Sequence, residues 1–439
     1  MKVAIDADAE HVSIIKELLS IWSISYTPSD MSDVTIVYRR NPTPQSKKCL
    51  VIPCESSLFR QWSERQKLNV IQSAGAEVMV PAVSKTELRV CPSISFQFNN
   101  TVFENNDNIA ILGLDIIDEY MRILNRTLGA KSSFKYRLFT LLPVGYSLAP
   151  RKLRDAIMSQ GNGLDDYCIR DVLPLDALRF ALANALQKLT KKKLAGRYNS
   201  CGKRICALTH DVETKDGLSK AVTIKRLEEK YDLPSAWYLP SAQYSLDKQT
   251  ITTLANYGEI GSHDTKHDGK LFDLSARRLN ERLLGSKKTL EKLAQTSVVG
   301  FRAPLLQHSK DILRTLNRCN YTYDSSIPTW ETKHPRTMRS HGIGTVFPTN
   351  IEGIVEIPLS LMQDHQFLNI SGLSPKELLH VWLSVMAEIK ELGGICVFLS
   401  HPEYSFLDTR DLSCYEELLN ALSSDSEVSV MCPKDLTKF

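Results

Sequence analysis

The C-terminal half of the chain alternates short apolar runs with longer segments in which apolar residues recur at helical spacing. The short runs predict strands and the longer segments predict helices. This regular alternation predicts a largely parallel sheet, open or closed into a barrel, so we expect an α/β barrel-like domain from Arg204 onward. Strands are expected at 205–209, 235–240, 258–262, 297–301, 354–359, 395–400 and 427–431, and helices near 218–231, 246–256, 274–294, 309–318, 375–392 and 411–423.

The N-terminal half has a less regular pattern. Residues 1–110 contain short apolar runs such as VAID and DVTIVY, with helices expected near 9–21 and 58–73, and so predict a small α/β accessory domain. Residues 111–200 predict a mainly helical connecting region, and residues 201–439 form the expected barrel domain. A chain of 439 residues is long enough for two or three such parts.

Composition and charge exclude several classes of protein. The 54 basic and 50 acidic residues give a net charge of +4, which is too balanced for a dedicated nucleic-acid surface. The chain has no GxGxxG or P-loop motif, so a nucleotide-binding module is not supported. The ten cysteines are scattered, which predicts reduced thiols and no four-cysteine zinc site.

The first residues and the hydropathy of the chain bear on its location. The opening MKVAIDADAE lacks the basic-then-apolar order of a signal peptide. No apolar run approaches the length that a transmembrane segment needs. We therefore expect a cytoplasmic protein.

Polar clusters follow four of these strand-like runs, and a fifth cluster follows the run around Tyr321 and Tyr323. In parallel α/β sheets the carboxyl ends of the strands meet at one edge, where the active sites of these folds lie. Acids, histidines and an arginine placed repeatedly at strand ends are hard to explain by packing alone, so we expect one site. The clusters are His210–Glu213 (HDVE), His263–His267 (HDTKH), Arg302–Pro304 (RAP), Asp324–Ser326 (DSS) and His401–Glu403 (HPE).

His263 and His267 are spaced so that both can reach one cation. Glycines and aspartates in and around this segment predict a loop, unlike the helical HExxH of zinc proteases. We expect a carboxylate as the third ligand, because two histidines and one acid leave a position open to water. Asp211 and Glu213 are the candidates, and one could stay free as a base. The alternatives are two unrelated surface histidines and a pair of acids that cap the next helix.

Arg302 and His401 would complete such a site. A fixed guanidinium beside a carboxylate lowers the pKa of that acid and orients it, whereas a structural Arg–Asp pair elsewhere is the alternative. His401 follows the run ICVFLS and would serve as a general acid opposite a metal, but on its own it reads as a buried core side chain. No role is predicted for His210, His308 or His365.

Taken in order, the clusters resemble the motifs of the polysaccharide deacetylases with a NodB-homology domain, the family 4 carbohydrate esterases. The resemblance covers about residues 204–435 and implies a distorted (β/α)7-type barrel. THDVE resembles the first motif, EIGSHDTKH the second, FRAP the third, YDSS the fourth and FLSH the fifth. The first motif departs from the usual adjacent aspartates because Val212 separates the two acids. Leu305 stands where an aromatic residue often follows the third motif.

The resemblance also implies roles for individual residues. The reverse assignment of the two acids in the first motif stays open. The implied roles are Glu213, His263 and His267 as metal ligands, Asp211 as the base steadied by Arg302, His401 as the general acid, the N–H of Leu305 after Pro304 as an oxyanion donor, and Asp324 as a residue that shapes the site.

The implied reaction is removal of an N-acetyl group from an amino sugar, a glycan or a glycan precursor. Zinc is the divalent metal expected first, with cobalt, nickel, iron and manganese as alternatives. A cytoplasmic location favours a nucleotide sugar, a lipid-linked precursor or a surface-glycan intermediate over finished cell-wall polymer. The runner-up is hydrolysis of another non-peptide C–N bond, such as a ureide or cyclic amide. A zinc protease and a glycan-binding pseudoenzyme are further alternatives.

The sequence assigns no chemistry to residues 1–200. We expect this region to mediate homo-oligomer formation or contact with a glycan-synthesis partner. We expect no nucleic-acid partner, because the charge of the chain is nearly balanced.

Overall fold

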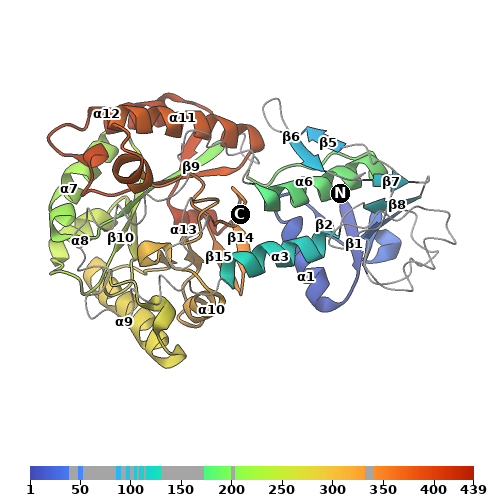
Figure 1. The fold of residues 1–439 in the computed structure, drawn as a ribbon, viewed down its shortest axis with the longest axis horizontal. Coiled ribbons are helices and arrows are strands. Elements are labelled where there is room, and N and C mark those ends of the chain that lie inside the picture. The colour runs from blue at the N-terminus through green and yellow to red at the C-terminus, as the bar shows by residue number, and fades with distance from the viewer. Residues whose placement is uncertain are drawn as a thin grey trace. The chain divides into compact units, whose positions relative to one another are not determined.

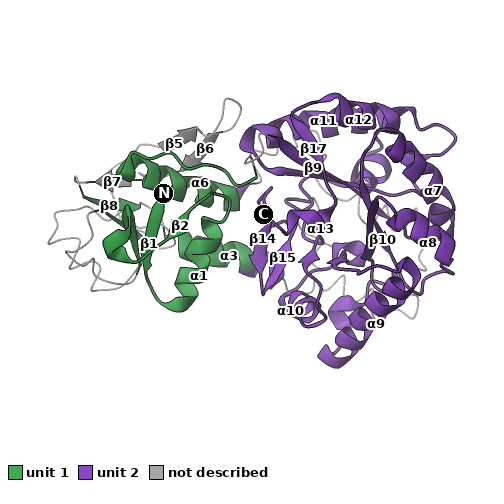
Figure 2. Ribbon diagram, turned by 180° about the vertical axis from the view of Figure 1, so that it is seen from behind, with its two compact units in different colours: residues 1–124, 174–200 green, residues 125–173, 201–439 purple. Residues whose placement is uncertain are grey.

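The structure is a computed structural model that divides into two compact units (Figure 2). Unit 1 comprises residues 1–124 and 174–200, and unit 2 comprises residues 125–173 and 201–439. Residues 174–200 therefore group with the N-terminal strands, whereas the sequence predicted a separate helical region over 111–200. The described residues are 1–38, 48–52, 86–89, 95–98, 103–105, 108–112, 115–129, 173–198, 203–331 and 341–439.

Unit 1 is built on a six-stranded sheet in the order β2-β1-β3-β4-β8-β7. The pairings are parallel except that between β7 and β8. The apolar runs VTIVY and CLVI form β3 and β4, which are buried along their whole length. The helix expected near 9–21 is present as α1, and the one expected near 58–73 lies outside the described residues. The elements are β1 (Lys2–Asp6), α1 (Ala9–Leu18), β2 (Ser25–Tyr26), β3 (Val34–Tyr38), β4 (Cys49–Ile52), the antiparallel pair β5 (Thr86–Arg89) and β6 (Ser95–Phe98), β7 (Phe103–Asn105), β8 (Ile109–Leu112), α3 (Ile116–Leu128, which begins in this unit) and α6 (Pro174–Thr190).

Unit 2 confirms the predicted α/β domain with a distorted, barrel-like sheet. The described strands run in the order β14-β15-β13-β12-β11-β10-β9-β16, with β17 paired to β9, and only the β14–β15 pairing is antiparallel. The sheet curls inside a surround of helices (Figure 1), and its described strands leave it open between β14 and β16. The strands are β9 (Arg204–Asp211), β10 (Ser235–Leu239), β11 (Gly258–Ser262), β12 (Gly300–Phe301), β13 (Tyr323–Asp324), β14 (Thr349–Ile351), β15 (Ile354–Glu356), β16 (Ile395–Ser400) and β17 (Val428–Val430).

Local sequence signals mark both ends of α11 (Pro375–Leu392), a helix of unit 2. In α11, Ser374 and Glu377 form a reciprocal capping box, Pro375 opens the first turn, and Gly393 ends the helix with φ of 75°. None of the described helices combines the length and the apolar character that a membrane span requires. The helices are α7 (Lys215–Lys230), α8 (Lys248–Ala255), α9 (Ala276–Ala294), α10 (Lys310–Arg318), α11 (Pro375–Leu392), α12 (Ser413–Ser424) and α13 (Pro433–Leu436).

Candidate metal and catalytic site

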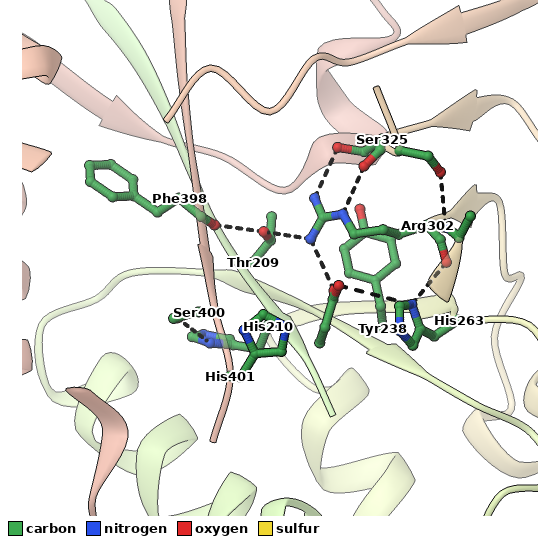
Figure 3. Close-up of polar contacts among 12 residues, drawn as sticks. Thr209, His210, Tyr238, His263, Arg302, Ser325, Phe398, Ser400 and His401 are labelled. Atoms are coloured by element: carbon green, nitrogen blue, oxygen red, sulfur yellow. Dashed lines mark hydrogen bonds and ion pairs between the residues drawn. The ribbon is translucent and has the colours of Figure 1, made fainter. Parts of the chain in front are cut away.

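The strand register gathers the predicted polar clusters at one edge of the unit 2 sheet (Figure 3). The pairings between these strands are parallel, so residues that follow each strand end lie at the same carboxyl edge. The clusters are thus brought together in space as the sequence predicted. The register pairs are Asp211 with Tyr238, Ser262 with Phe301, Phe301 with Asp324, and His210 with Ser400.

Glu213, His263 and His267 form a group in which each offers a ligand atom within 4.8 Å of the others. His267 Nε2 lies 2.8 Å from Glu213 Oε1, and the two imidazole rings are 5.5 Å apart between centroids. Ligand atoms on one tetrahedral zinc lie roughly 3.3 Å from one another, so the three atoms of this group would reach one cation after small shifts. The acid in the group is Glu213, which favours it over Asp211 as the candidate ligand.

The ring of His263 directs an unprotonated nitrogen into this group. Its Nδ1 lies 2.9 Å from the carbonyl oxygen of Arg302, which can only accept, so Nδ1 carries the proton. Burial lowers the pKa of His263 to about 4, which keeps the ring neutral and leaves a lone pair on Nε2. Within the part of the chain that the structure describes, the buried Nε2 of His263 has no hydrogen-bond partner, whereas Nε2 of His267 lies 2.8 Å from Glu213 Oε1. An unsatisfied imidazole nitrogen beside a second imidazole and a carboxylate fits a bound cation.

Glu213 is available to such a cation because its neighbour caps the following helix. The Thr214 hydroxyl accepts a hydrogen bond from the N–H of Gly217 at 3.0 Å at the start of α7. Burial alone would raise the pKa of Glu213, but the charge and hydrogen bond of His267 and the charge of His401 hold that pKa well below its usual value. The carboxyl is therefore an anion, and neither acid of the first cluster is needed as the helix cap.

The segment from His263 to His267 is a loop, as its glycines and aspartates predicted. The N–H of His263 donates to the carbonyl of Leu239 at 2.9 Å, and Asp264 has φ of 64°. The left-handed conformation of Asp264 turns the chain between the two histidines. The zinc-protease alternative requires both histidines on one helix, so it does not fit this loop.

Arg302 is fully buried among Thr209, Tyr238 and Ser325 (Figure 3). Its Nη1 donates to Asp211 Oδ1 at 3.1 Å and to Thr209 Oγ1 at 2.9 Å. Its Nε and Nη2 donate to the carbonyl and hydroxyl oxygens of Ser325 at 2.8 and 2.9 Å. The guanidinium also lies over the ring of Tyr238, 4.2 Å from the centroid. The predicted Arg–Asp pair is therefore part of this site and not a structural pair elsewhere.

His401 is fixed by an acid that the sequence did not reveal. Asp364 Oδ1 lies 2.6 Å from His401 Nδ1, and Asp364 Oδ2 accepts the backbone N–H of His401 at 2.7 Å. The other ring nitrogen, Nε2, lies 3.7 Å from Glu213 Oε1. Burial alone would lower the pKa of His401, but Asp364 and the site acids raise it to about 10. His401 is thus a protonated imidazole held beside the candidate metal group.

His210, which had no predicted role, belongs to a buried network on the opposite face of β9. Its Nε2 lies 2.7 Å from Glu228 Oε1, and its Nδ1 lies 3.0 Å from the hydroxyl of Ser400. Tyr415 donates to the same Glu228 oxygen at 2.5 Å. Successive side chains of a strand point to opposite faces of the sheet. His210 therefore lies on the face of β9 that is opposite the site, whereas the neighbouring Asp211 faces the site.

Pro304, Leu305 and Asp324 lie at the third and fourth clusters. Pro304–Leu306 is a short 3-10 turn in which Leu305 has φ of 55°, a conformation that costs roughly 1–2 kcal/mol for a leucine. Asp324 Oδ1 accepts the hydroxyl of Ser326 at 2.5 Å, and that hydroxyl accepts the N–H of Ala303 at 2.8 Å. Burial raises the pKa of Asp324 to about 6. Asp324 therefore stabilises the strained turn through the hydroxyl of Ser326.

Comparison with known proteins places part of unit 2 in a known family. Residues 199–323 match the family model described as polysaccharide deacetylase. One similar solved structure is a Mycobacterium smegmatis protein classed with the polysaccharide deacetylases, at 18% identity over 54% of this chain and 90% of that chain, with a TM-score of 0.45. A Pseudomonas aeruginosa PAO1 protein of the same class shares 13% identity over 56% and 93%, with a TM-score of 0.45. A family 4 acetyl xylan esterase from Clostridium thermocellum, in complex with a cobalt ion, shares 12% identity over 54% and 91%, with a TM-score of 0.36. No curated protein matches the chain.

Proposed function

We propose that this chain, which contains a NodB-homology polysaccharide deacetylase domain, is a metal-dependent hydrolase that removes an N-acetyl group from an amino sugar or its glycan. The observation that carries the proposal is the group of Glu213, His263 and His267, in which the buried Nε2 of His263 lacks a hydrogen-bond partner. Asp211, which pairs with Arg302, and His401, which pairs with Asp364, flank this group. Amide hydrolysis needs a base and an acid on either side of the reacting carbonyl, and these residues supply both.

Glu213, His263 and His267 would hold the metal. A divalent metal supplies Lewis acidity, which lowers the pKa of water and polarises a carbonyl. Zinc is the first candidate, because it accepts two imidazoles and a carboxylate. Cobalt, nickel, iron and manganese accept the same donors, and cellular supply decides among them.

Asp211 acts as the general base in this proposal. Its carboxylate takes a proton from the attacking water, and the oxygen of that water bonds to the acetyl carbon. Arg302 donates to Asp211 Oδ1 and keeps the carboxylate oriented before the reaction begins. The backbone N–H of Leu305, in the strained turn after Pro304, is the proposed donor to the developing oxyanion.

His401 acts as the general acid. Its imidazolium donates a proton to the sugar nitrogen as the C–N bond breaks, which yields acetate and a free amine. Asp364 Oδ1 lies 2.6 Å from Nδ1, so Nδ1 points at Asp364 and the Nε2 proton points at the site. Asp364 thereby sets both the orientation and the protonation of the ring.

Acetate release with and without metal tests the proposed function. The protein is stripped with a chelator, reloaded with zinc or cobalt, and offered free, oligomeric and nucleotide-linked N-acetylamino sugars. We expect acetate and amine in equal amounts from at least one substrate, and none from the stripped protein. A ureide and a cyclic amide in the same panel identify the runner-up activity. Metal binding without hydrolysis of any substrate would favour the glycan-binding pseudoenzyme instead.

Replacing Asp364 with asparagine is expected to lower kcat by about 10²-fold at neutral pH and to leave metal content unchanged. The acid works only while His401 is protonated, so the rate falls as pH rises through the pKa of that ring. The Asp364 carboxylate raises this pKa, and its loss lowers the pKa. The alkaline limb of the kcat profile should therefore move to lower pH.

The matched control for this variant is Asp408→Asn, because Asp408 pairs with Arg410 at the surface. The control should keep both kcat and its pH profile. An Asp364→Asn enzyme whose alkaline limb stays in place would show that Asp364 does not set the protonation of His401.

A further inference from the structure

The loop between His263 and His267 turns through a residue in the left-handed conformation. Asp264 adopts φ of 64° and has a buried side chain. Aspartate is one of the residues that adopt this conformation readily, but its buried carboxylate requires hydrogen-bond or ion-pair partners. Both imidazole rings depend on this turn for their directions, because it lies between them in the chain. The loop therefore needs an external support.

Arg282 on α9 reaches into this loop through every part of its guanidinium. Its Nε donates to Asp264 Oδ1 at 2.7 Å. Its Nη1 and Nη2 donate to the two carboxylate oxygens of Asp268 at 3.0 and 2.8 Å. Nη2 also donates to the carbonyl of Lys266 at 2.9 Å. One side chain thus fixes three of the residues that lie between or next to the histidines.

The same face of α9 provides a second contact one helical turn later. The hydroxyl of Ser286 donates to the carbonyl of Asp264 at 2.8 Å and lies 2.9 Å from the hydroxyl of Ser262. Residues four apart share a helix face, so Ser286 and Arg282 approach the loop together. Leu279 and Leu283 are buried on α9 and anchor the helix that carries them.

We infer that Arg282 is the positioning residue that sets the directions of His263 and His267 before a metal binds. The planar guanidinium meets Asp268 with two parallel hydrogen bonds and still reaches Asp264, which a lysine ammonium cannot do. The inference rests on the proposed metal site. It does not depend on deacetylation, because its consequence is metal affinity.

Metal affinity of the Arg282→Gln protein tests this inference. Dissociation constants for zinc and cobalt are measured by chelator competition, and the visible absorption of the cobalt-loaded protein reports ligand geometry. We expect Arg282→Gln to bind both metals about 10- to 100-fold more weakly, with an altered cobalt spectrum, as for other residues that orient metal ligands. Arg282→Lys should lie between this variant and the wild type. An Arg282→Gln affinity within twofold of the wild type would overturn the inference.

The matched control is Arg277→Gln on the same helix. Arg277 is 81% exposed and pairs with Glu281 at the surface, whereas Arg282 is 14% exposed. The control should bind metal as the wild type does. Thermal unfolding of the metal-free proteins separates the two explanations, because a merely structural role predicts loss of folding at the assay temperature and a positioning role predicts weak binding by folded protein.

If the Arg282→Gln protein does not fold, Asp268→Asn is the variant that tests the inference. Asp268 is partly exposed and accepts two of the Arg282 hydrogen bonds, so its variant should also weaken metal binding, by a smaller factor. Unchanged metal affinity in this variant would count against the positioning role of Arg282. If the wild type binds metal but releases no acetate, the proposed function fails while the affinity comparison still decides the role of Arg282.

Discussion

Replacing Asp211 with asparagine is expected to lower the rate of acetate release by about 10³-fold while bound metal stays at the wild-type level. The amide keeps the size of the side chain and can still accept the Arg302 hydrogen bond, which is 3.1 Å in the wild type. It cannot take up a proton near neutral pH, so the general base is lost without a change of shape. Elemental analysis and initial rates from one preparation measure both quantities.

The Glu213→Gln variant provides the opposite expectation. An amide oxygen carries no charge and is a weaker metal ligand than a carboxylate, so this variant should lose metal together with activity. The exposed Asp216 is a suitable control, because Asp216→Asn changes an acid that pairs only with Lys220 at the surface of α7. Metal loss in Asp211→Asn with metal retained in Glu213→Gln would reverse the two roles. A fully active Asp211→Asn enzyme would remove Asp211 from the mechanism.

The barrel-like domain was predictable because its apolar periodicity and strand order agree. The differences are at strand ends and have local causes. The run predicted as a strand over 297–301 forms only Gly300–Phe301, because the N–H of Val298 donates to the side chain of Glu291 and not to a strand. The strand predicted over 354–359 stops at Glu356, and Pro358 beyond it lacks an N–H. The N–H groups of Ile357 and Leu359 still donate to the carbonyls of Asp324 and Ile327, so the pairing continues there as an isolated bridge.

The candidate site was predictable where its residues follow strands. Asp211, Arg302 and His401 stand directly at strand ends, and parallel register brings such positions together. Asp364 lies on a segment outside any strand, 37 positions before the histidine that it holds, and no local pattern marks it. The sequence gives little indication that Arg282 is a buried contact residue. It adjoins Leu283, which is buried, but it lies on a helix whose exposed face has other arginines. Asp364 and Arg282 each contact residues that are distant in the sequence. Such tertiary contacts are not encoded in a local sequence pattern.

Replacing His267 with alanine is expected to take metal content from about one equivalent per chain to none retained after dialysis, with acetate release abolished. The variant leaves a site of one imidazole and one carboxylate, and two ligands hold a divalent cation weakly. His380→Ala, which removes an exposed histidine from α11, is the control for loss of a histidine as such.

The metal content of the wild-type protein is the reference for that of His267→Ala. Retention of metal by the wild type and its loss from His267→Ala would support the group of Glu213, His263 and His267 as the metal site. A wild type that retains no metal and binds no added zinc, cobalt, nickel, iron or manganese would contradict it. The same residues would then be a remnant, because the buried Nε2 of His263 without a cation is an unsatisfied nitrogen that a working hydrolase would have no reason to keep. A glycan-binding protein without hydrolytic activity would become the better explanation of this fold.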